Sequence, residues 1–185
     1  GVTRINGIVI FVPGLLNGEE AEIGITKMKK NYGYGRIIKI LKPSLHRIDP
    51  ICSVYKQCGG CQLQHMDSNE QNTFKDCFHK IAGMNVEIQP IIKVEPHWNY
   101  RNKVQIPVQC NDNKVEMGFY APHSNRIVQY DVCHVQTDLS NELTDYFRKQ
   151  FDMLACGKDM RHVLIKHAHN TGEVMVALVV RNYPF

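Results

Sequence analysis

Three cysteines crowd into the stretch CSVYKQCGGCQLQH, which runs from Cys52 to His65. Their spacing is C-x5-C-x2-C, and the glycine pair between the last two, Gly59 and Gly60, is expected to adopt positive φ and to offer N–H groups to sulfur. Closely spaced thiols in a chain without a recognisable export signal indicate metal or cluster chemistry more than disulfides. We therefore expect a reducing compartment, the cytoplasm, and a site that gathers these thiols around one inorganic ligand.

A site of this kind normally takes four ligands, so a fourth must come from elsewhere in the chain. Cys133 lies in YDVCHVQ, a polar connection between an expected strand and an expected helix, where a side chain can turn inward. This position favours Cys133 without deciding the question. The three-plus-one spacing favours an iron–sulfur cluster over zinc, which prefers paired C-x2-C units, and zinc stays open on spacing alone. The other candidates for the fourth ligand are Cys77, Cys110 and Cys156.

Basic residues concentrate between positions 24 and 48, where seven lysines and arginines occur without a single Asp or Glu. The same stretch carries Tyr32 and Tyr34. Amines that neutralise phosphates, next to rings that stack on bases, are typical of a nucleic-acid surface. A solvated strand face is the alternative, because basic patches are common on globular domains. We expect phosphate contacts from Lys27, Lys29, Lys30 and Arg36.

The apolar patterning predicts an α+β fold that is mostly β. Short strand-like runs with tight turns fill the first part of the chain, IVIFV (8–12), EEAEIGI (19–25) and GYGRIIKIL (33–41), and they predict a small OB-like barrel over residues 1–48. The connector KPSLHRIDP (42–50) carries prolines near both ends, which places a second domain at 49–185. No apolar run is long enough to cross a membrane.

The second domain is expected to contain two helices and several strands. A capping-box pattern at Ser68 and an apolar stripe that ends at Gly83 predict a helix over 68–83, with Cys77 on its stripe. Strands are expected at KVQIPV (103–108), KVEMGFY (114–120) and RIVQY (126–130), and a hairpin around Asn170-Thr171-Gly172. A second helix is indicated by spacings of four between Leu139, Leu143, Phe147 and Phe151.

Several segments together resemble one known family. The cysteine stretch is followed by YRNKVQIPV (100–108), GFYAPHSNRIVQYDVCHVQ (118–136) and TGEVMVALVV (171–180), with Gln71 and Lys75 between. These segments resemble the RNA uracil-5-methyltransferases, which methylate uridine in ribosomal or transfer RNA with S-adenosylmethionine. The opening segment resembles the TRAM domain that precedes the cluster in many members. The resemblance covers essentially the whole chain.

The resemblance implies roles for individual residues. It makes Cys52, Cys58, Cys61 and Cys133 the ligands of a structural [4Fe-4S] cluster. It places Tyr100, Arg101 and Lys103 on the RNA-facing side of the central domain, where planar and cationic groups suit single-stranded RNA. For Tyr100 an ordinary sheet aromatic is the alternative. The implied target is 23S rRNA.

The resemblance places the chemistry of methyl transfer outside this chain. A cysteine thiolate that attacks uracil, a base and the S-adenosylmethionine domain belong to the C-terminal half of the family, and no G-x-G fingerprint occurs here. We therefore expect no catalytic residue and no S-adenosylmethionine site in this chain, which would be inactive alone. The apolar stripe of helix 68–83, without a catalytic domain to cover it, would favour self-association. The alternatives are a standalone iron–sulfur RNA-binding module and a small iron–sulfur electron carrier.

Overall fold

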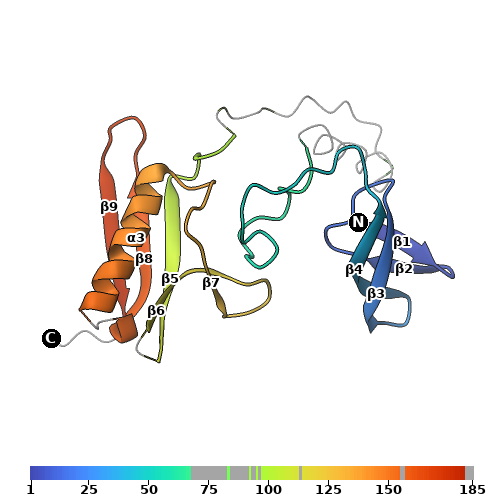
Figure 1. Ribbon diagram of the computed structural model, residues 1–185, viewed down its shortest axis with the longest axis horizontal. Coiled ribbons are helices and arrows are strands. Elements are labelled where there is room, and N and C mark those ends of the chain that lie inside the picture. Colours follow the sequence, from blue (N-terminus) through green and yellow to red (C-terminus); the bar gives the residue numbers. More distant parts are fainter. Residues whose placement is uncertain are drawn as a thin grey trace. The chain divides into compact units, whose positions relative to one another are not determined.

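The computed structural model describes residues 1–67, 83, 92, 95, 97–112, 114–154 and 157–181. These residues belong to two compact units (Figure 1). The first unit is Gly1–Pro50 with Gln62–Ile91, and the second is Ile51–Cys61 with Ile92–Phe185. The described residues form nine strands and one α-helix, which confirms the α+β, mostly β, fold class.

The first unit contains a four-stranded sheet in the order β1-β2-β4-β3. Its strands are β1 (Val2–Ile5), β2 (Ile8–Phe11), β3 (Glu20–Met28) and β4 (Tyr32–Lys42). β2 runs parallel to β4, and the other pairs are antiparallel. Strand β1 was not expected from the sequence. It is joined to β2 by Asn6 and Gly7, both at positive φ, as a tight hairpin turn requires.

Strand β4 begins with alternating tyrosine and glycine, and the two residue types face opposite sides of the sheet. Gly33 and Gly35 are buried, whereas Tyr32 and Tyr34 are exposed. A Cβ atom on Gly33 would lie 2.6 Å from Met28 Sδ and 2.9 Å from Ile10 Cδ1. A Cβ here would displace the ends of both side chains and would lie 3.1 Å from the carbonyl oxygen of Lys27 on β3, so this position favours glycine.

The expected closure of this sheet into an OB-like barrel is not confirmed. Within residues 1–67, the edge strands β1 and β3 do not pair with each other. An OB fold closes with five strands, and this segment supplies four, of which β1 and β2 have only four residues each. The sheet of the first unit is therefore open over the described residues.

The second unit contains a five-stranded antiparallel sheet in the order β7-β6-β5-β8-β9. The expected strands and hairpin are confirmed, since Asn170–Gly172 joins the last two strands. The strands are β5 (Lys103–Asn111), β6 (Lys114–Tyr120), β7 (Ile127–Gln129), β8 (Met160–His167) and β9 (Val174–Val180), with a short 3-10 turn, η1 (Gly157–Asp159), before β8.

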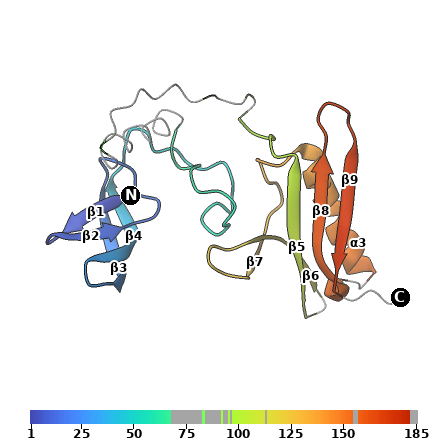
Figure 2. The same ribbon diagram turned by 180° about the vertical axis from the view of Figure 1, so that it is seen from behind.

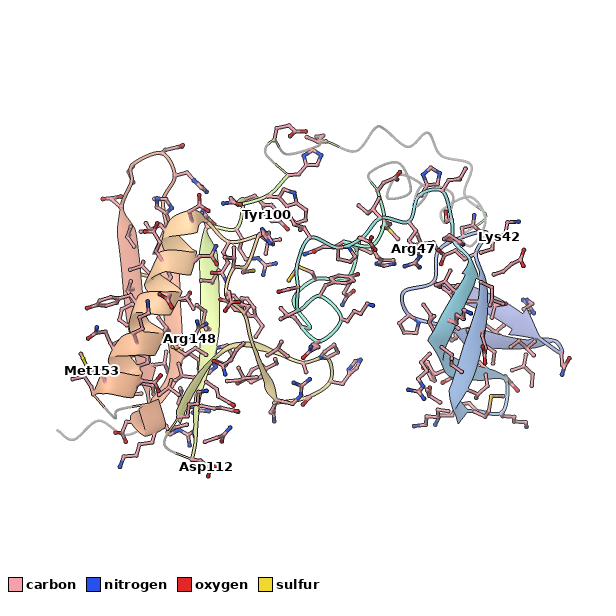
Figure 3. All side chains as sticks on the ribbon, in the orientation of Figure 1. Lys42, Arg47, Tyr100, Asp112, Arg148 and Met153 are labelled. Atoms are coloured by element: carbon pink, nitrogen blue, oxygen red, sulfur yellow. The ribbon has the colours of Figure 1, made fainter. Side chains whose placement is uncertain are left out.

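The helix expected from Leu139, Leu143, Phe147 and Phe151 is also confirmed, as α3 (Asp138–Met153). Figure 2 shows it beside the sheet, against which Leu143, Phe147 and the buried Phe151 pack. The core beneath it consists of alternate residues of three strands: Val104, Ile106, Val108, Val115, Met117, Val163 and Ile165. The side chain of Arg148 reaches from α3 to the carbonyl oxygens of Met117 and Tyr130, at 3.3 and 3.1 Å (Figure 3).

Three sequence-based expectations lie outside the described residues. They are the helix over 68–82, Cys77 and Cys156. The self-association expected from the helix therefore stays a prediction. Among the described helices, none has the length and apolar character needed to span a bilayer.

Candidate cysteine site and nucleic-acid interface

The cysteine segment Ile51–Cys61 belongs to the second unit, although the residues on both sides of it belong to the first. The amide of Gly59 donates a 2.9 Å hydrogen bond to the carbonyl oxygen of Tyr120 at the end of β6. A Cβ atom on Gly59 would lie 2.9 Å from that oxygen and 3.3 Å from the nitrogen of Pro122. Glycine is therefore required by this close approach of two backbones.

The glycine pair was expected to supply positive φ angles, and this expectation is wrong. Neither Gly59 nor Gly60 has a positive φ. The second part of the expectation, an amide directed at sulfur, is confirmed: the Gly60 N–H donates to Cys58 Sγ at 3.3 Å. Short turns hold the segment, because the amide of Tyr55 donates to Cys52 O at 3.1 Å and that of Cys58 to Val54 O at 2.9 Å.

Cys133 lies in the connection between β7 and α3, as expected from the sequence. Its backbone is fixed by Asn141, on the first turns of the helix. The Cys133 amide donates to Asn141 Oδ1 at 2.9 Å, and Asn141 Nδ2 donates back to the Cys133 carbonyl oxygen at 3.2 Å. Thr137 caps the same helix by accepting a hydrogen bond from the amide of Ser140. The start of α3 therefore positions the thiol of Cys133.

Tyr130 stabilises this connection from the strand side. Its ring stacks on Phe119 with centroids 5.3 Å apart, and its hydroxyl accepts a 2.7 Å hydrogen bond from Gln136 Nε2. Gln136 has no exposed surface. Burial raises the pKa of the Tyr130 phenol to about 12, so the hydroxyl stays neutral over the physiological range.

The YRNK segment runs beside the Cys133 connection. The amide of Asn99 donates to His134 O, and that of Arg101 donates to Val135 O, both at 2.8 Å. Arg101 also forms an isolated parallel bridge with Gln136. Tyr100, labelled in Figure 3, lies between these two anchors with half of its surface exposed. Sequence positions 100–101 and 133–136, far apart in the chain, are therefore neighbours.

Cys58 and Cys133 both lie close enough to Arg101 for its charge to lower their pKa values. Burial raises the pKa of the Cys58 thiol, the neighbouring thiols of Cys61 and Cys52 raise it further, and the amide of Gly60 and the charge of Arg101 lower it. Burial likewise raises the pKa of Cys133; the amides of Val135 and Gln136 and the charge of Arg101 lower it, while Cys61 raises it. Cys61 thus interacts with cysteines on both sides of the site. A bound cation would reverse the effect of burial by stabilising the thiolates.

The other described cysteine is not part of this group. Cys110 lies in β5, opposite Val115 on β6. None of the described cysteines forms a disulfide. Within the described ranges, no three His, Cys, Asp or Glu side chains are close enough together to hold a single metal ion.

The basic residues expected to contact RNA occur in both units. In the first unit, Lys27 and Arg36 lie on β3 and β4, and Lys29 and Lys30 lie in the turn between these strands; all are exposed. In the second, Lys103 is exposed at the start of β5, directly opposite Lys166 on β8. Sequence reasoning missed Lys166, because its position opposite Lys103 depends on the strand register. Two like charges at opposed positions repel each other, so an anion placed between them is favoured.

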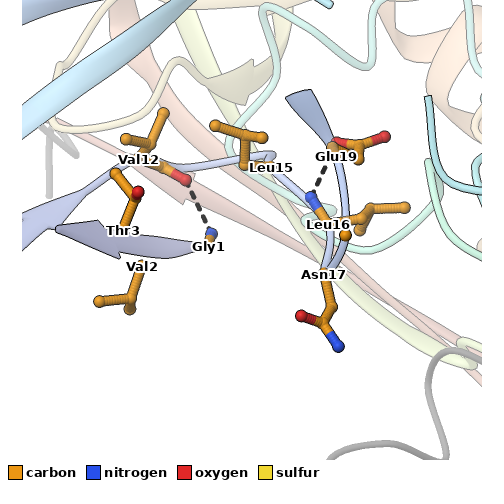
Figure 4. Close-up of a pocket in the computed structure, with 9 residues that line it drawn as sticks. Gly1, Val2, Thr3, Val12, Leu15, Leu16, Asn17 and Glu19 are labelled. Carbon is orange, nitrogen blue, oxygen red and sulfur yellow. Dashed lines mark hydrogen bonds between the residues drawn. The ribbon is translucent and has the colours of Figure 1, made fainter. Parts of the chain in front are cut away.

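The first unit also contains a small cavity of about 230 Å³ (Figure 4). Its one charged side chain is Glu19, which already has four donors: Arg47 Nε and Nη2, and the amides of Leu16 and Ser44. These contacts, led by that with Arg47, lower the pKa of Glu19 to about 2. The carboxylate therefore connects the loop before β3 to the segment after β4. The cavity is lined by Gly1, Val2, Thr3, Val12, Leu15, Leu16, Asn17, Gly18 and Glu19.

Comparison with known proteins matches residues 1–38 to the TRAM domain. An uncharacterized RNA methyltransferase of Clostridium tetani is 35% identical over 98% of this chain. One of Oceanobacillus iheyensis is 36% identical over 100% of this chain. This chain spans 42% and 43% of these two relatives. Over nearly its whole length, this chain is similar to curated RNA methyltransferases. These matches agree with the methyltransferase part of the resemblance, and the TRAM match confirms the interpretation of the first segment.

A solved structure has the same fold over almost the whole chain. It is the Pyrococcus abyssi tRNA (uracil-54, C5)-methyltransferase in complex with S-adenosyl-L-homocysteine, with a TM-score of 0.68 and 21% sequence identity. The superposition covers 99% of this chain and 46% of that protein. At this identity the likeness shows the fold alone.

Proposed function

We propose that this chain is the RNA-binding, [4Fe-4S]-bearing part of an S-adenosylmethionine-dependent RNA uracil-5-methyltransferase. One observation carries the proposal. Cys61 lies within electrostatic reach of both Cys58 and Cys133, although Cys133 comes from a segment far away in the sequence, and Cys52 lies within reach of Cys58. The methyltransferase names of the relatives support the activity of the longer protein.

The donor set fits an iron–sulfur cluster better than a single ion. All four candidate ligands are cysteines in a three-plus-one spacing, which would suit an iron–sulfur cluster, whereas structural zinc prefers paired C-x2-C units. The N–H group of Gly60, directed at Cys58 Sγ, is a typical partner of cluster sulfurs.

Cys52, Cys58, Cys61 and Cys133 would hold the cluster. When bound, it would supply a covalent cross-link between the cysteine segment and the connection before α3, which constrains the unfolded chain. Other residues of this chain would position these ligands and balance their charge. Asn141 orients Cys133, Gly59 anchors the cysteine segment on Tyr120, and Arg101 compensates negative charge at the thiolates.

RNA would bind the basic residues of both units. Lys27, Lys29, Lys30 and Arg36 would attract phosphates without sequence preference, while Tyr100, Arg101 and Lys103 would lie nearer the target uridine. We propose 23S rRNA as the substrate and the cytoplasm as the location. The structural relative from Pyrococcus abyssi is named for a transfer RNA, so both RNAs belong in the test.

The test is methyl transfer by the product of the whole reading frame that encodes this chain. We expect transfer of the labelled methyl group of S-adenosylmethionine to C5 of a uridine in unmodified ribosomal RNA, and no transfer by the 185-residue chain alone. A reading frame that stops at Phe185, combined with RNA binding by the chain, would instead establish a standalone RNA-binding module. A tightly bound cluster with reversible one-electron reduction and no RNA affinity would indicate an electron carrier.

A further inference from the structure

Three aromatic rings gather on one face of the sheet in the first unit. Phe11 comes from β2, and Tyr32 and Tyr34 come from β4. Their ring centroids are 6.0 Å (Phe11–Tyr32), 5.8 Å (Phe11–Tyr34) and 5.7 Å (Tyr32–Tyr34) apart. We call these three residues the aromatic face.

The strand register explains why the rings share a face. Phe11 is the Cα partner of Tyr34. Tyr32, two residues before Tyr34, lies on the same side of β4. The residues next to them in the sequence, Ile10, Gly33 and Gly35, are buried on the opposite side. The tyrosine–glycine alternation thus places the rings of β4 on the exposed side of the sheet, and at these positions β4 has no side chain on the buried side.

Each ring of the aromatic face is partly exposed: Phe11 by 40%, Tyr32 by 37% and Tyr34 by 41%. Three large rings in mutual contact form a contiguous apolar patch, and such a patch on a protein surface marks an interaction site more often than chance exposure does. The rings alone would suit any flat apolar partner. The charges around them decide between partners.

Cations surround the rings on the same face. Lys27 on β3 is the Cα partner of Tyr34 on β4. On the other side, Arg4 on β1 pairs with Val9 on β2, and Val9 in turn pairs with Tyr32. Arg36 follows Tyr34 on the same side of β4, and its Nε lies 3.7 Å from where a Cβ of Gly24 would be, so its guanidinium covers that glycine. The acidic residues Glu20 and Glu22 lie at the other end of β3, opposite Lys42 and Lys39.

We propose that the aromatic face stacks unpaired bases of single-stranded RNA while Arg4, Lys27 and Arg36 bind the adjacent phosphates. Bases stack on aromatic rings in a sequence-tolerant way, and a cationic rim attracts a polyanion and repels a basic protein partner. This inference rests on the proposed function for its ligand, RNA. It goes further by naming the residues that contact bases and by requiring those bases to be unpaired.

The test compares three probes in binding to the 185-residue chain. They are a single-stranded RNA of about ten nucleotides, a strand of equal length with abasic sites, and the same RNA annealed to its complement. We expect the base-bearing single strand to bind at least about tenfold more tightly than the other two, since base–aromatic stacking adds to its affinity alone. The changes Phe11→Leu and Tyr34→Leu should remove most of this difference and leave the salt dependence unchanged.

Two further variants keep the result interpretable. Tyr34→Phe preserves the ring and should bind as the parent does, whereas Tyr146→Leu, an exposed aromatic on α3, is the matched control and should also have no effect. Contact is read directly from Tyr34→Trp in a Trp98→Phe background, which leaves one indole, on the aromatic face. Base-bearing RNA should quench its fluorescence, and the abasic strand should not.

Outcomes separate this inference from the proposed function. Equal affinity for base-bearing and abasic strands, or full affinity in a folded Tyr34→Leu variant, would overturn the aromatic face while leaving RNA binding intact. The second result would assign the three rings to protein contacts or to the stability of the sheet. Absence of any RNA binding by the folded parent chain would overturn both proposals. Failure of methyl transfer with intact stacking would count against the proposed enzyme alone.

Discussion

The amide nitrogen of Gly59 lies 2.9 Å from the carbonyl oxygen of Tyr120, and a Cβ on the same glycine would approach that oxygen to the same distance. This contact fastens the cysteine segment to the strand end of β6. Gly60 differs from Gly59 in the space around it. A Cβ on Gly60 would meet only Cys58 Sγ at 3.4 Å, an ordinary contact.

Gly59→Ala is therefore expected to displace the cysteine segment. Overpacking of this kind costs about 1–3 kcal/mol. Bound iron per chain and the thermal unfolding midpoint should both fall. Gly60→Ala is the matched control and should reduce both by much less. Equal effects of the two changes would contradict the assigned role of the Gly59–Tyr120 contact.

The Glu19–Arg47 pair predicts acid sensitivity of the first unit. The Glu19 side chain has no exposed surface, and its pKa is lowered from 4.5 to about 2. A carboxylate with a lowered folded-state pKa stabilises the protein fully above its unfolded pKa and loses this contribution as the pH falls from about 4.5 to about 2. The loss is at most about 3 kcal/mol in the free energy of unfolding.

Urea unfolding at a series of acidic pH values checks this prediction. Glu19→Gln should lower stability at neutral pH and weaken the dependence between pH 4.5 and 2. Glu20→Gln is the control, because the Glu20–Lys42 pair is largely exposed and such pairs contribute little. A Glu19→Gln profile parallel to that of the parent would reject the pair as the cause.

The opposed Lys103 and Lys166 predict a trade between stability and RNA affinity. Lys166→Ala should raise the free energy of unfolding by about 0.2–1 kcal/mol, because it removes repulsion between like charges across β5 and β8. It should also weaken RNA binding. Lys149→Ala, which removes a cation already paired with Asp145 on α3, should leave RNA binding unchanged. Binding that is unaffected by Lys166→Ala would remove this pair from the RNA interface.

Combined replacement of Lys27, Lys29, Lys30 and Arg36 by alanine should flatten the salt dependence of RNA binding. Each lost contact with a single strand lowers the slope of log affinity against log salt by about 0.7. Anisotropy titrations at several salt concentrations measure this slope. An unchanged slope in the folded variant would place the phosphate contacts elsewhere.

Local sequence signals predicted most elements of the second unit. The strands before and after Asp112, the helix through Phe147 and the hairpin at Asn170–Gly172 follow periodicity and turn chemistry, which act over a few residues. Strand β1 was missed although Asn6-Gly7 is a strong hairpin signal. The OB-like barrel was expected from strand count alone, whereas closure depends on pairing between distant strands.

The site was harder to predict because it depends on contacts between distant segments. The sequence alone favoured Cys133 as the partner of the cysteine stretch, but it could not show that Asn141 fixes its backbone or that residues 99–101 run beside it. Gly59 was singled out for conformational freedom, while its place in the structure shows a need for space. Phe11 and Lys166 enter the interface only through strand register.

The central claim is that Cys133 completes a four-cysteine cluster site, and the most direct measurement is iron and acid-labile sulfide in anaerobically purified protein. The account predicts about four of each per chain, and a marked loss in Cys133→Ser but not in Cys110→Ser. Full iron and sulfide in a folded Cys133→Ser protein, or stoichiometric zinc in place of iron in the parent, would contradict it.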